Sequence, residues 1–548
     1  MKSLVASARR VLPCTRHPRA VSPQRGGEPP APVPTVPLEE VERGEGPGSV
    51  GDVGEDEKVP MLAALEDAGQ GGAQKGLGDA SAAALTDATS LQESKVPGTP
   101  ESAPPAEAAV PLVGKGPEAA PAPRFWEAYR NKFRGAGAKG PPVPTWSYSA
   151  VSWVGSFTGI GTLGLIHTYL LPHFTLLPLV MLVGSFGAMA VLLFGQPAAP
   201  PSQPWNAICG NGIGGLVGVV VYEGAEWLGL GKQLWLTGGL AVSLTIIGQE
   251  RMQSQHPPGG ATALLFTLMP NLQVLHWVYV ICPALLGAVI FVFLSMLINN
   301  LSEGRSYPVS THPLNLEPAP EAKPDPQAPA RELAAVTEAQ AKQDPAPGFL
   351  GGYFGKWRGK KGPPMPQPPW SQTGFSWLGA FLGIATLGLL QMYAMPLLPV
   401  TGIVLLVGSF GAMSVLVYSM PGAPFSQPKN ALLGNTLGGL VGVAVYKSCR
   451  LCGLGDAFWL MCALAVSLTI VAQEQTSSVH PPGGATALIF VIRSVASELD
   501  PDHPFYMPEM SDLYFFCPGF LGAAVLVCIG LLVNNLSEKR SYPGRWWS

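Results

Sequence analysis

Charged residues are scarce in this chain of 548 residues. They make up 13% of the sequence, about half of the ~25% found in soluble globular domains. Only 8 cysteines are present, which excludes a disulfide scaffold, and the net charge of −3 gives no indication of nucleic-acid binding. Hydrophobic residues reach 47% and glycine fills 66 positions. Scarce charge with abundant apolar residues and glycine is typical of a membrane protein.

Catalytic motifs are also lacking. The sequence has no phosphate-binding loop, no convincing metal-ligand spacing and no nucleophile with a positioned base. We therefore expect no enzyme activity, no metal and no cofactor. Because no ATPase module is recognisable, any transport would occur through a channel or a secondary carrier.

Two polar stretches are rich in proline, alanine or glycine. Residues 28–145 and the linker 309–369 contain few aliphatic residues. Such segments bury too little apolar surface to offset their chain entropy, so we expect both to be disordered. Residues 544–548 form a short C-terminal tail.

The first 27 residues are basic. They contain six lysines and arginines, and no acidic residue precedes Glu28. They lack the continuous apolar core of a secretory signal. A basic, serine-containing and acid-free segment is typical of an organelle transit peptide, with a basic disordered tail as the alternative.

The remainder of the chain is a tandem duplication. Several segments recur 224 positions later without a gap, and they begin at Trp146 and Trp370, Gly184 and Gly408, and His256 and His480. The duplicated units are residues 146–308 and 370–543. Two such long copies do not make a solenoid.

Each unit contains five long apolar stretches. They lie near 149–170, 174–195, 206–222, 233–249 and 275–299, and near 373–394, 397–419, 430–446, 457–473 and 512–534. Each approaches the ~20 residues that a spanning helix needs. The apolar run after each His-Pro-Pro is shorter and predicts a half-helix. We therefore predict an all-α polytopic membrane protein with about five spans and one half-helix per unit.

Two features of the sequence give opposite predictions for the relative orientation of the two units. Lysines and arginines cluster before the first span of each unit, which places both units the same way round by the positive-inside rule. Five spans per unit would instead invert the second unit. We give more weight to the span count.

The sharpest motif is His-Pro-Pro-Gly-Gly. Two prolines suit a helix start, and two glycines would let a substrate approach the backbone. The half-helix that follows would direct its N-terminal dipole at the turn and favour a small anion. A tight interhelical turn is the alternative. We assign substrate or ion binding to His256, Pro257, Pro258, Gly259, Gly260, His480, Pro481, Pro482, Gly483 and Gly484.

Other polar residues lie within or at the ends of apolar stretches, where an unpaired polar group is costly. A Gln-Glu pair closes the span before each His-Pro-Pro and could bind a proton or a cation; an interfacial carboxylate is the alternative. An asparagine in each glycine-rich span more often serves packing. The candidates for proton coupling or for lining a pathway are Gln249, Glu250, Gln473, Glu474, Asn211 and Asn435.

These motifs together resemble the HPP family of integral membrane proteins. His-Pro-Pro-Gly-Gly-Ala-Thr-Ala, Gly-Ser-Phe-Gly-Ala and an Asn-Asn-Leu ending occur in both units. The resemblance implies nitrite transport into the chloroplast, in the inner envelope, to supply nitrite reductase in the stroma. A usual member resembles a single unit, so the fused pair is expected to replace a homodimer.

We therefore expect a transporter of a small inorganic anion, with nitrite foremost and proton coupling as one option. Its expected partners are the lipid bilayer and the anion, with no nucleic acid, and either a homo-oligomer or a pseudo-dimer of the two repeats is expected. One alternative is a channel or carrier for chloride, nitrate, formate or a cation. Another is a membrane scaffold that transports nothing, in which the buried polar residues only pack. A membrane enzyme is the least favoured.

Overall fold

The computed structural model describes residues 125–135, 137, 140–174, 179–310, 349–359, 367–501, 503 and 506–547. The predicted transit peptide, residues 1–27, lies outside the described residues. So do most of the predicted tail and most of the linker.

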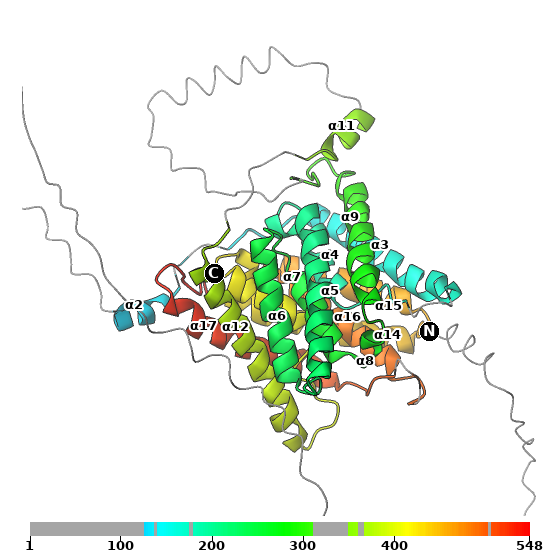
Figure 1. The fold of residues 1–548 in the computed structure, drawn as a ribbon. Helices are drawn as coiled ribbons and strands as arrows, with labels where there is room; N and C mark the ends of the chain where they lie inside the picture. Colours follow the sequence, from blue (N-terminus) through cyan, green and yellow to red (C-terminus); the bar gives the residue numbers. More distant parts are fainter. Residues whose placement is uncertain are drawn as a thin grey trace, which may run out of the picture. The chain divides into compact units, whose positions relative to one another are not determined.

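The regular elements of the described residues are all helices (Figure 1). The first unit contains α3 (Trp146–Leu165), α4 (Ser185–Ala190), α5 (Pro204–Trp227), α6 (Leu234–Arg251), α7 (Pro257–Leu268), α8 (Pro270–Gln273) and α9 (Leu286–Asn299). The second contains α12 (Trp370–Leu389), α13 (Ser409–Ser414), α14 (Pro428–Leu451), α15 (Phe458–Gln475), α16 (Pro481–Ala496) and α17 (Leu521–Leu536). The helices α2 (Phe125–Lys132) and α11 (Phe349–Lys356) precede the two units.

Short turns of other helical types extend several of these helices. The π-helical turns are η1 (Ile166–Leu170), η3 (Val191–Gly195), η5 (Val280–Leu285), η6 (Leu390–Ala394), η8 (Val415–Ser419) and η11 (Phe516–Phe520). The 3₁₀ turns are η2 (Leu171–His173), η4 (Pro200–Ser202), η7 (Met395–Leu397), η9 (Pro424–Ser426) and η10 (Asp512–Phe515).

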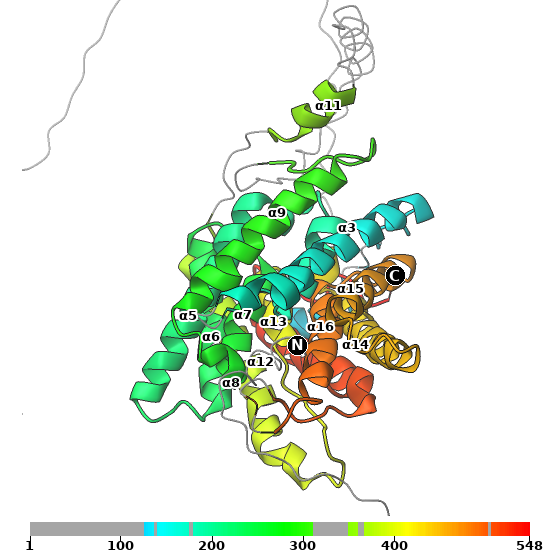
Figure 2. The ribbon, with the colours of Figure 1, turned by 90° about the vertical axis from the view of Figure 1, so that its right-hand side faces the viewer.

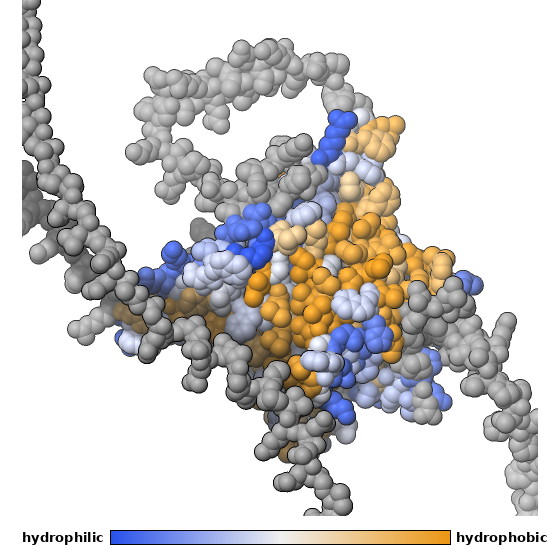
Figure 3. Space-filling view, in the orientation of Figure 1, coloured by the Kyte–Doolittle hydropathy of each residue, from blue (hydrophilic) through white to orange (hydrophobic). Residues whose placement is uncertain are grey.

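Six continuous helical segments are long and apolar enough to cross a membrane. They are Trp146–His173, Pro204–Trp227, Val280–Asn299, Trp370–Leu397, Phe458–Gln475 and Asp512–Leu536. Only 39% to 61% of the most apolar window of each is buried inside the protein. The remaining apolar residues face outward, and Figure 3 shows them gathered on the face where α5 and α9 lie. The predicted all-helical membrane fold is confirmed.

The second predicted span of each unit is shorter than expected. Among the described residues of the stretches 174–195 and 397–419, helices of spanning length are replaced by the short apolar helices Ser185–Gly195 and Ser409–Ser419. In the second stretch, Pro399 and Gly402 disfavour a helix before Ser409. The predicted half-helices after His-Pro-Pro are confirmed as α7 and α16. Each unit therefore has two short helices rather than one.

Hydrogen bonds show that the two units run in the same direction. Within the first unit, the start of α3 bonds to the end of η3 and to Arg305 beyond α9. The start of α5 bonds to the end of α6, and Ser202 before it bonds to the residue after η3. Arg251 at the end of α6 donates to Thr373 at the start of α12. Gln475 at the end of α15 donates to Ser149 at the start of α3.

Both units thus begin and end at one end of the molecule. It is called the basic end here because Lys132 and Lys356 bond there to the chain beyond the last helices, α17 and α9. The inverted arrangement favoured by the five-span count is wrong. An odd number of passes would instead separate the start and the end of each unit.

The two units interleave. Helix α3 of the first unit packs along α15 of the second, and the equivalent helix α12 of the second unit packs along α6 of the first. Figure 2 shows α3 beside α15. The short helices pair in the same reciprocal way, α4 with α16 and α13 with α7. Such reciprocity is the pattern of a two-fold symmetric interface.

The repeat begins earlier than the predicted boundary at residue 146. Tyr129 and Lys132 of α2 recur in α11 as Tyr353 and Lys356, at the same offset of 224. Helix α2 bonds to the chain end of the second unit, through Tyr129 to Leu532 and through Lys132. Helix α11 bonds to the end of the first unit in the same way. The leading helices are therefore exchanged between units.

Candidate functional site

Each His-Pro-Pro turn connects two helices close to the basic end. His256 has an extended backbone and caps α7, whose first residues are Pro257 and Pro258. Its Nδ1 lies 2.7 Å from the carbonyl oxygen of Pro201. A carbonyl only accepts, so Nδ1 carries the proton. The buried Nε2 atom has no hydrogen-bond partner within the described structure.

His480 repeats this arrangement in the second unit. Its Nδ1 lies 2.7 Å from the carbonyl oxygen of Phe425, and its Nε2 is also buried without a partner among the described residues. Both histidine side chains are fully buried. Buried polar atoms are normally hydrogen-bonded, so a purely structural turn does not account for an unpaired ring nitrogen in both units.

A glutamine holds each turn closed. The Gln249 amide nitrogen donates to the carbonyl oxygens of His256, at 2.8 Å, and Gly210, at 3.0 Å. Its Oε1 accepts from the His256 backbone N–H at 3.2 Å. Gln473 makes the same three bonds to His480 and Gly434. These glutamines were candidates for coupling or for a pathway, and their contacts are those of a clamp on the turn.

The glycines of the motif are packed against other helices. A Cβ at Gly259 would lie 2.1 Å from the carbonyl oxygen of Gly210 on α5. A Cβ at Gly260 would lie 2.4 Å from the carbonyl oxygen of Gly411 on α13. The sequence predicted that a substrate would approach these glycines; in the structure, helix backbone does. Binding of an ion by the ten motif residues stays a prediction.

The amide groups at the start of α7 are mostly absent or paired. Two prolines supply no N–H, and the Gly259 N–H donates to the His256 carbonyl at 3.0 Å. The same pattern occurs at Gly483 and His480. The positive end of the half-helix thus faces the turn with few free donors, which weakens the anion-site argument made from the helix dipole.

Asn211 and Asn435 belong to buried polar clusters. Thr262 on α7 donates to Asn211 Oδ1, with 2.6 Å between the atoms, and lies 2.9 Å from the Ser185 hydroxyl. Thr486 lies 3.0 Å from Asn435 Oδ1 and 2.9 Å from the Ser409 hydroxyl. Sequence reasoning gave no role to these threonines. Their recurrence 224 positions apart was the available signal, but the two threonines could equally have been packing residues.

The glutamates reach across to the other unit. Ser152 of the first unit donates to Glu474 Oε1 at 2.7 Å, and Arg305 of the first unit donates to Ser152 at 2.8 Å. In the reciprocal set, Ser376 donates to Glu250 Oε1 at 2.8 Å.

Arg540 completes that second set by donating to Ser376 at 2.8 Å. Each set is named here an Arg–Ser–Glu bridge. Glu250 and Glu474 are fully buried, and the Oε2 atom of each has no partner in the described part of the chain.

The two arginines lie beyond the last helices α9 and α17 but are buried. Arg305 stacks on the Tyr148 ring, with its guanidinium carbon 3.7 Å from the ring centre. Burial lowers the pKa of Arg305, whereas Tyr148 and Glu474 raise it. Burial likewise lowers the pKa of Arg540, and Glu250 raises it. Sequence reasoning treated Arg305 and Arg540 as interface anchors and missed the bridges, because the partner is on the other unit.

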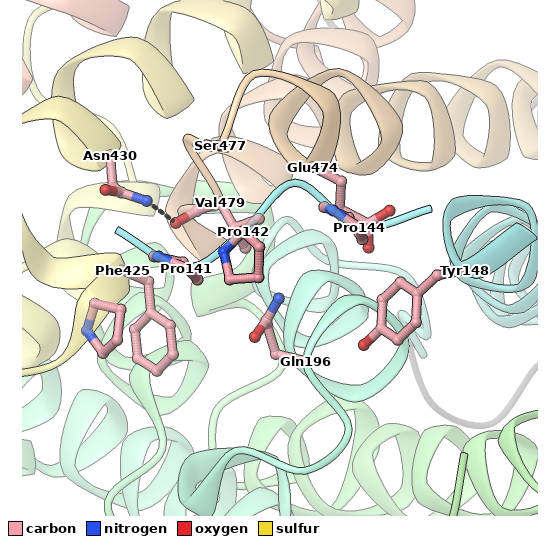
Figure 4. Close-up of a pocket in the computed structure, with 11 residues that line it drawn as sticks. Pro141, Pro142, Pro144, Tyr148, Gln196, Phe425, Asn430, Glu474, Ser477 and Val479 are labelled. Atoms are coloured by element: carbon pink, nitrogen blue, oxygen red, sulfur yellow. Dashed lines mark hydrogen bonds between the residues drawn. The ribbon is translucent and has the colours of Figure 1, made fainter. Parts of the chain in front are cut away.

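A cavity of about 230 Å³ lies between the units at the basic end (Figure 4). It is called the Glu474 cavity here, and its lining consists of Pro141, Pro142, Pro144, Tyr148, Gln196, Pro424, Phe425, Asn430, Glu474, Ser477 and Val479. In Figure 4, Glu474 and Tyr148 lie on one side and Asn430 and Phe425 on the other, with Gln196 between them.

The cavity adjoins the second turn, since Val479 precedes His480 and the Phe425 carbonyl holds its ring. Over the described residues, no group of three or more histidine, cysteine, aspartate or glutamate side chains could hold a metal ion.

Comparison with known proteins identifies the family. The family model described as "HPP, transmembrane region" matches residues 141–308 and 365–543. Two Dictyostelium discoideum proteins, each named only as a transmembrane protein, are 38% identical over 200 and 199 residues. Each match covers 36% of this chain and, respectively, 57% and 63% of the relative, so the chain spans less than two thirds of either. No solved structure matches the chain. Since the family model covers both units and more than half of the chain, the protein belongs to the HPP family of transmembrane proteins.

Proposed function

We propose that this protein carries a small inorganic anion across a membrane, with nitrite as the first candidate and protons as the coupling ion. The observation that carries the proposal is the repeated set of buried ionisable groups at the turns. Within the described residues, the Nε2 of His256 and His480 and the Oε2 of Glu250 and Glu474 have no hydrogen-bond partner. Ionisable groups inside a helical membrane protein mark ion pathways more often than packing sites.

The tautomer of the histidines supports a proton-dependent step. With Nδ1 donating to a carbonyl, a proton can be added only at Nε2. A protonated Nε2 becomes a hydrogen-bond donor with positive charge, which suits a small anion. Coupling to protons also addresses the energetics, because a potential that is negative on the receiving side opposes anion entry by ~2.3 kcal/mol per 100 mV.

The proposed location is the inner envelope of the chloroplast, with residues 1–27 as a transit peptide that is basic and free of acid. We also propose that the two units act as a fused pseudo-dimer. The reciprocal Arg–Ser–Glu bridges support this.

A scaffold without transport is the second candidate. The observation that favours it is the saturation of Gln249, Gln473 and the motif glycines by contacts within the protein. In that case the turns would only fix the helices.

Uptake into proteoliposomes tests the proposal. The full chain, reconstituted and verified as folded, is assayed for nitrite uptake with and without an inward proton gradient. We expect uptake above that of empty liposomes, and an increase with the gradient. Nitrate, chloride and formate in place of nitrite identify the preferred anion. If none of these ions enters in either condition, the scaffold is favoured and the transport proposal fails.

Replacing both histidines then tests the site. The variant His256→Ala with His480→Ala should take up less nitrite than the wild type and show an altered pH dependence. The matched control is His173→Ala, because His173 lies in η2, outside both His-Pro-Pro turns. Unchanged uptake and unchanged pH dependence in the double variant would exclude the histidines from the transport step.

A further inference from the structure

Glu250 and Glu474 occupy equivalent positions but different surroundings. Glu250 Oε1 accepts from two hydroxyls, Ser376 at 2.8 Å and Ser419 at 2.7 Å. Glu474 Oε1 accepts from Ser152 at 2.7 Å. The position equivalent to Ser419 in the first unit is Gly195, which has no hydroxyl. The hydroxyl that Ser419 gives to Glu250 is therefore missing at Glu474, where Ser149 is the other nearby hydroxyl.

Glu474 also lines the Glu474 cavity, whereas Glu250 is not among its lining residues. The Glu474 side chain is fully buried, and its Oε2 has no partner in the ranges that the structure describes. Among the described residues it is the only acidic one in the cavity lining. The fused pair has thus become asymmetric, because Ser376 and Ser419 hold one carboxylate and the other belongs to a residue in the lining of a cavity.

In the part of the chain that the structure describes, two arginines contact residues at this cavity. Arg305 lies behind Ser152, at the Glu474 side. Arg545 donates to Asn430 Oδ1 at 3.3 Å, on the opposite side of the lining, and is buried. The remaining titratable neighbours are Tyr148, whose hydroxyl donates to the Gly195 carbonyl, and His480. Ionised Glu474 is therefore the one negative charge among two buried arginines.

We propose that the Glu474 cavity is the coupling site, where Glu474 takes up one proton and one small anion binds beside it. The proton comes from solution and neutralises the carboxylate. Arg305 and Arg545 then leave net positive charge around the cavity, and the anion balances it. Each ligand favours the binding of the other, which is the requirement for symport. This inference rests on the proposed function and assigns its coupling to one unit only.

The chain offers a matched pair of variants at Gly195. A Cβ there would lie 3.4 Å from Ile470 and 3.5 Å from Glu474 Oε1, which are ordinary contact distances. Gly195→Ser should give Glu474 the hydroxyl that Ser419 gives Glu250. An added hydrogen bond to a carboxylate favours its ionised form, so protonation should require a lower pH. Gly195→Ala adds the same Cβ without the hydroxyl.

Nitrite uptake by the full chain in proteoliposomes is measured against external pH. For Gly195→Ser we expect the pH of half-maximal uptake to fall by about one unit. Gly195→Ala should keep the wild-type profile. In Glu474→Gln, the increase in nitrite uptake caused by the proton gradient should be at least tenfold smaller than in the wild type. A wild-type profile in both Gly195→Ser and Glu474→Gln would overturn the proposal, as would stimulation by a sodium gradient in place of protons.

A binding measurement separates this inference from the proposed function. Nitrite is added to the detergent-purified full chain in weak buffer with a pH indicator. We expect about one proton taken up per chain for the wild type and none for Glu474→Gln. Wild-type uptake of nitrite without this proton signal would reject the coupling site and leave the transport proposal intact. Absence of nitrite uptake by folded wild-type protein would reject both.

Discussion

At the residue scale, Gln249 is the residue on which the first turn depends. Gln249→Leu keeps the side-chain size but removes all three hydrogen bonds of the clamp and leaves the backbone groups of His256 less satisfied. Unpaired buried polar groups cost about 1–3 kcal/mol each. We expect a loss of stability of that order, measured by thermal unfolding of the purified protein in detergent.

The control for this clamp is Gln233→Leu, at a partly buried glutamine whose side chain accepts from Trp235 at 3.2 Å. It should unfold within a few degrees of the wild type. Equal stability of the two variants would mean that the three clamp bonds do not hold the turn.

The motif glycines give a second prediction at this scale. Gly259→Ala would place a Cβ 2.1 Å from the Gly210 carbonyl oxygen, so α5 and α7 must separate. Overpacking of this kind costs about 1–3 kcal/mol and more where backbone must move. We expect a marked drop in the yield of folded protein, judged by size-exclusion chromatography.

Gly224→Ala on α5 is the matched control, because nothing lies within 4 Å of a Cβ there. Alanine is also the better helix former by about 1 kcal/mol. This variant should be as stable as the wild type or slightly more stable. If Gly259→Ala is also tolerated, the glycine is not needed for helix packing, and the predicted approach of a substrate regains support.

The sequence alone could identify the repeated motif but not the partners of its residues. Repetition at a fixed offset singled out His256 and Glu250 together with their counterparts. The Arg–Ser–Glu bridges stayed hidden because Ser152 precedes Glu474 by 322 positions. Nothing in the local pattern of Ser152 distinguishes it from a packing serine, and only the interleaving of the units brings these groups together.

At the element scale, the error in span count has a physical cause. Hydropathy registers apolar composition, and 174–195 is as apolar as a span. It does not register that Pro399 and Gly402 disfavour a helix in the first half of the equivalent stretch 397–419. The orientation argument from basic residues depended only on charge, and it agrees with the direction of both units in the structure.

The exchanged leading helices give a prediction at this scale. Lys132 of α2 donates to the carbonyl oxygens of Ser537, at 2.7 Å, and Arg540, at 2.8 Å. A lysine at a helix C-terminal end contributes about 0.3–1 kcal/mol. Lys132→Ala should loosen α2, and hydrogen exchange of its amides should become faster.

The comparison for α2 is Arg130→Ala, because Arg130 is exposed on the same helix. Its amide exchange should match the wild type. Equal exchange rates in the two variants would show that other contacts, such as Tyr129 with Leu532, hold α2 in place.

At the scale of the whole molecule, the interleaving decides what each unit can do alone. Helix α3 buries its small residues against α15, and Gly164 lies so close that a Cβ there would be 3.0 Å from the Trp459 backbone. Gly388 of α12 packs equally closely on Trp235 of α6. Each unit therefore buries helix surface against the other along α3 with α15 and α12 with α6, as subunits of a dimer do.

Cutting the linker tests this dependence. Co-expression of residues 1–330 and 331–548 should give two halves that purify together in equal amounts, because the contacts between units do not need the linker's continuity. Each half expressed alone would expose the Glu and Arg of its bridges, and we expect it to aggregate or to pair with a second copy of itself. A half that is folded and monomeric by itself would show that the units are independent, and the joint site at Glu474 would then lack its physical basis.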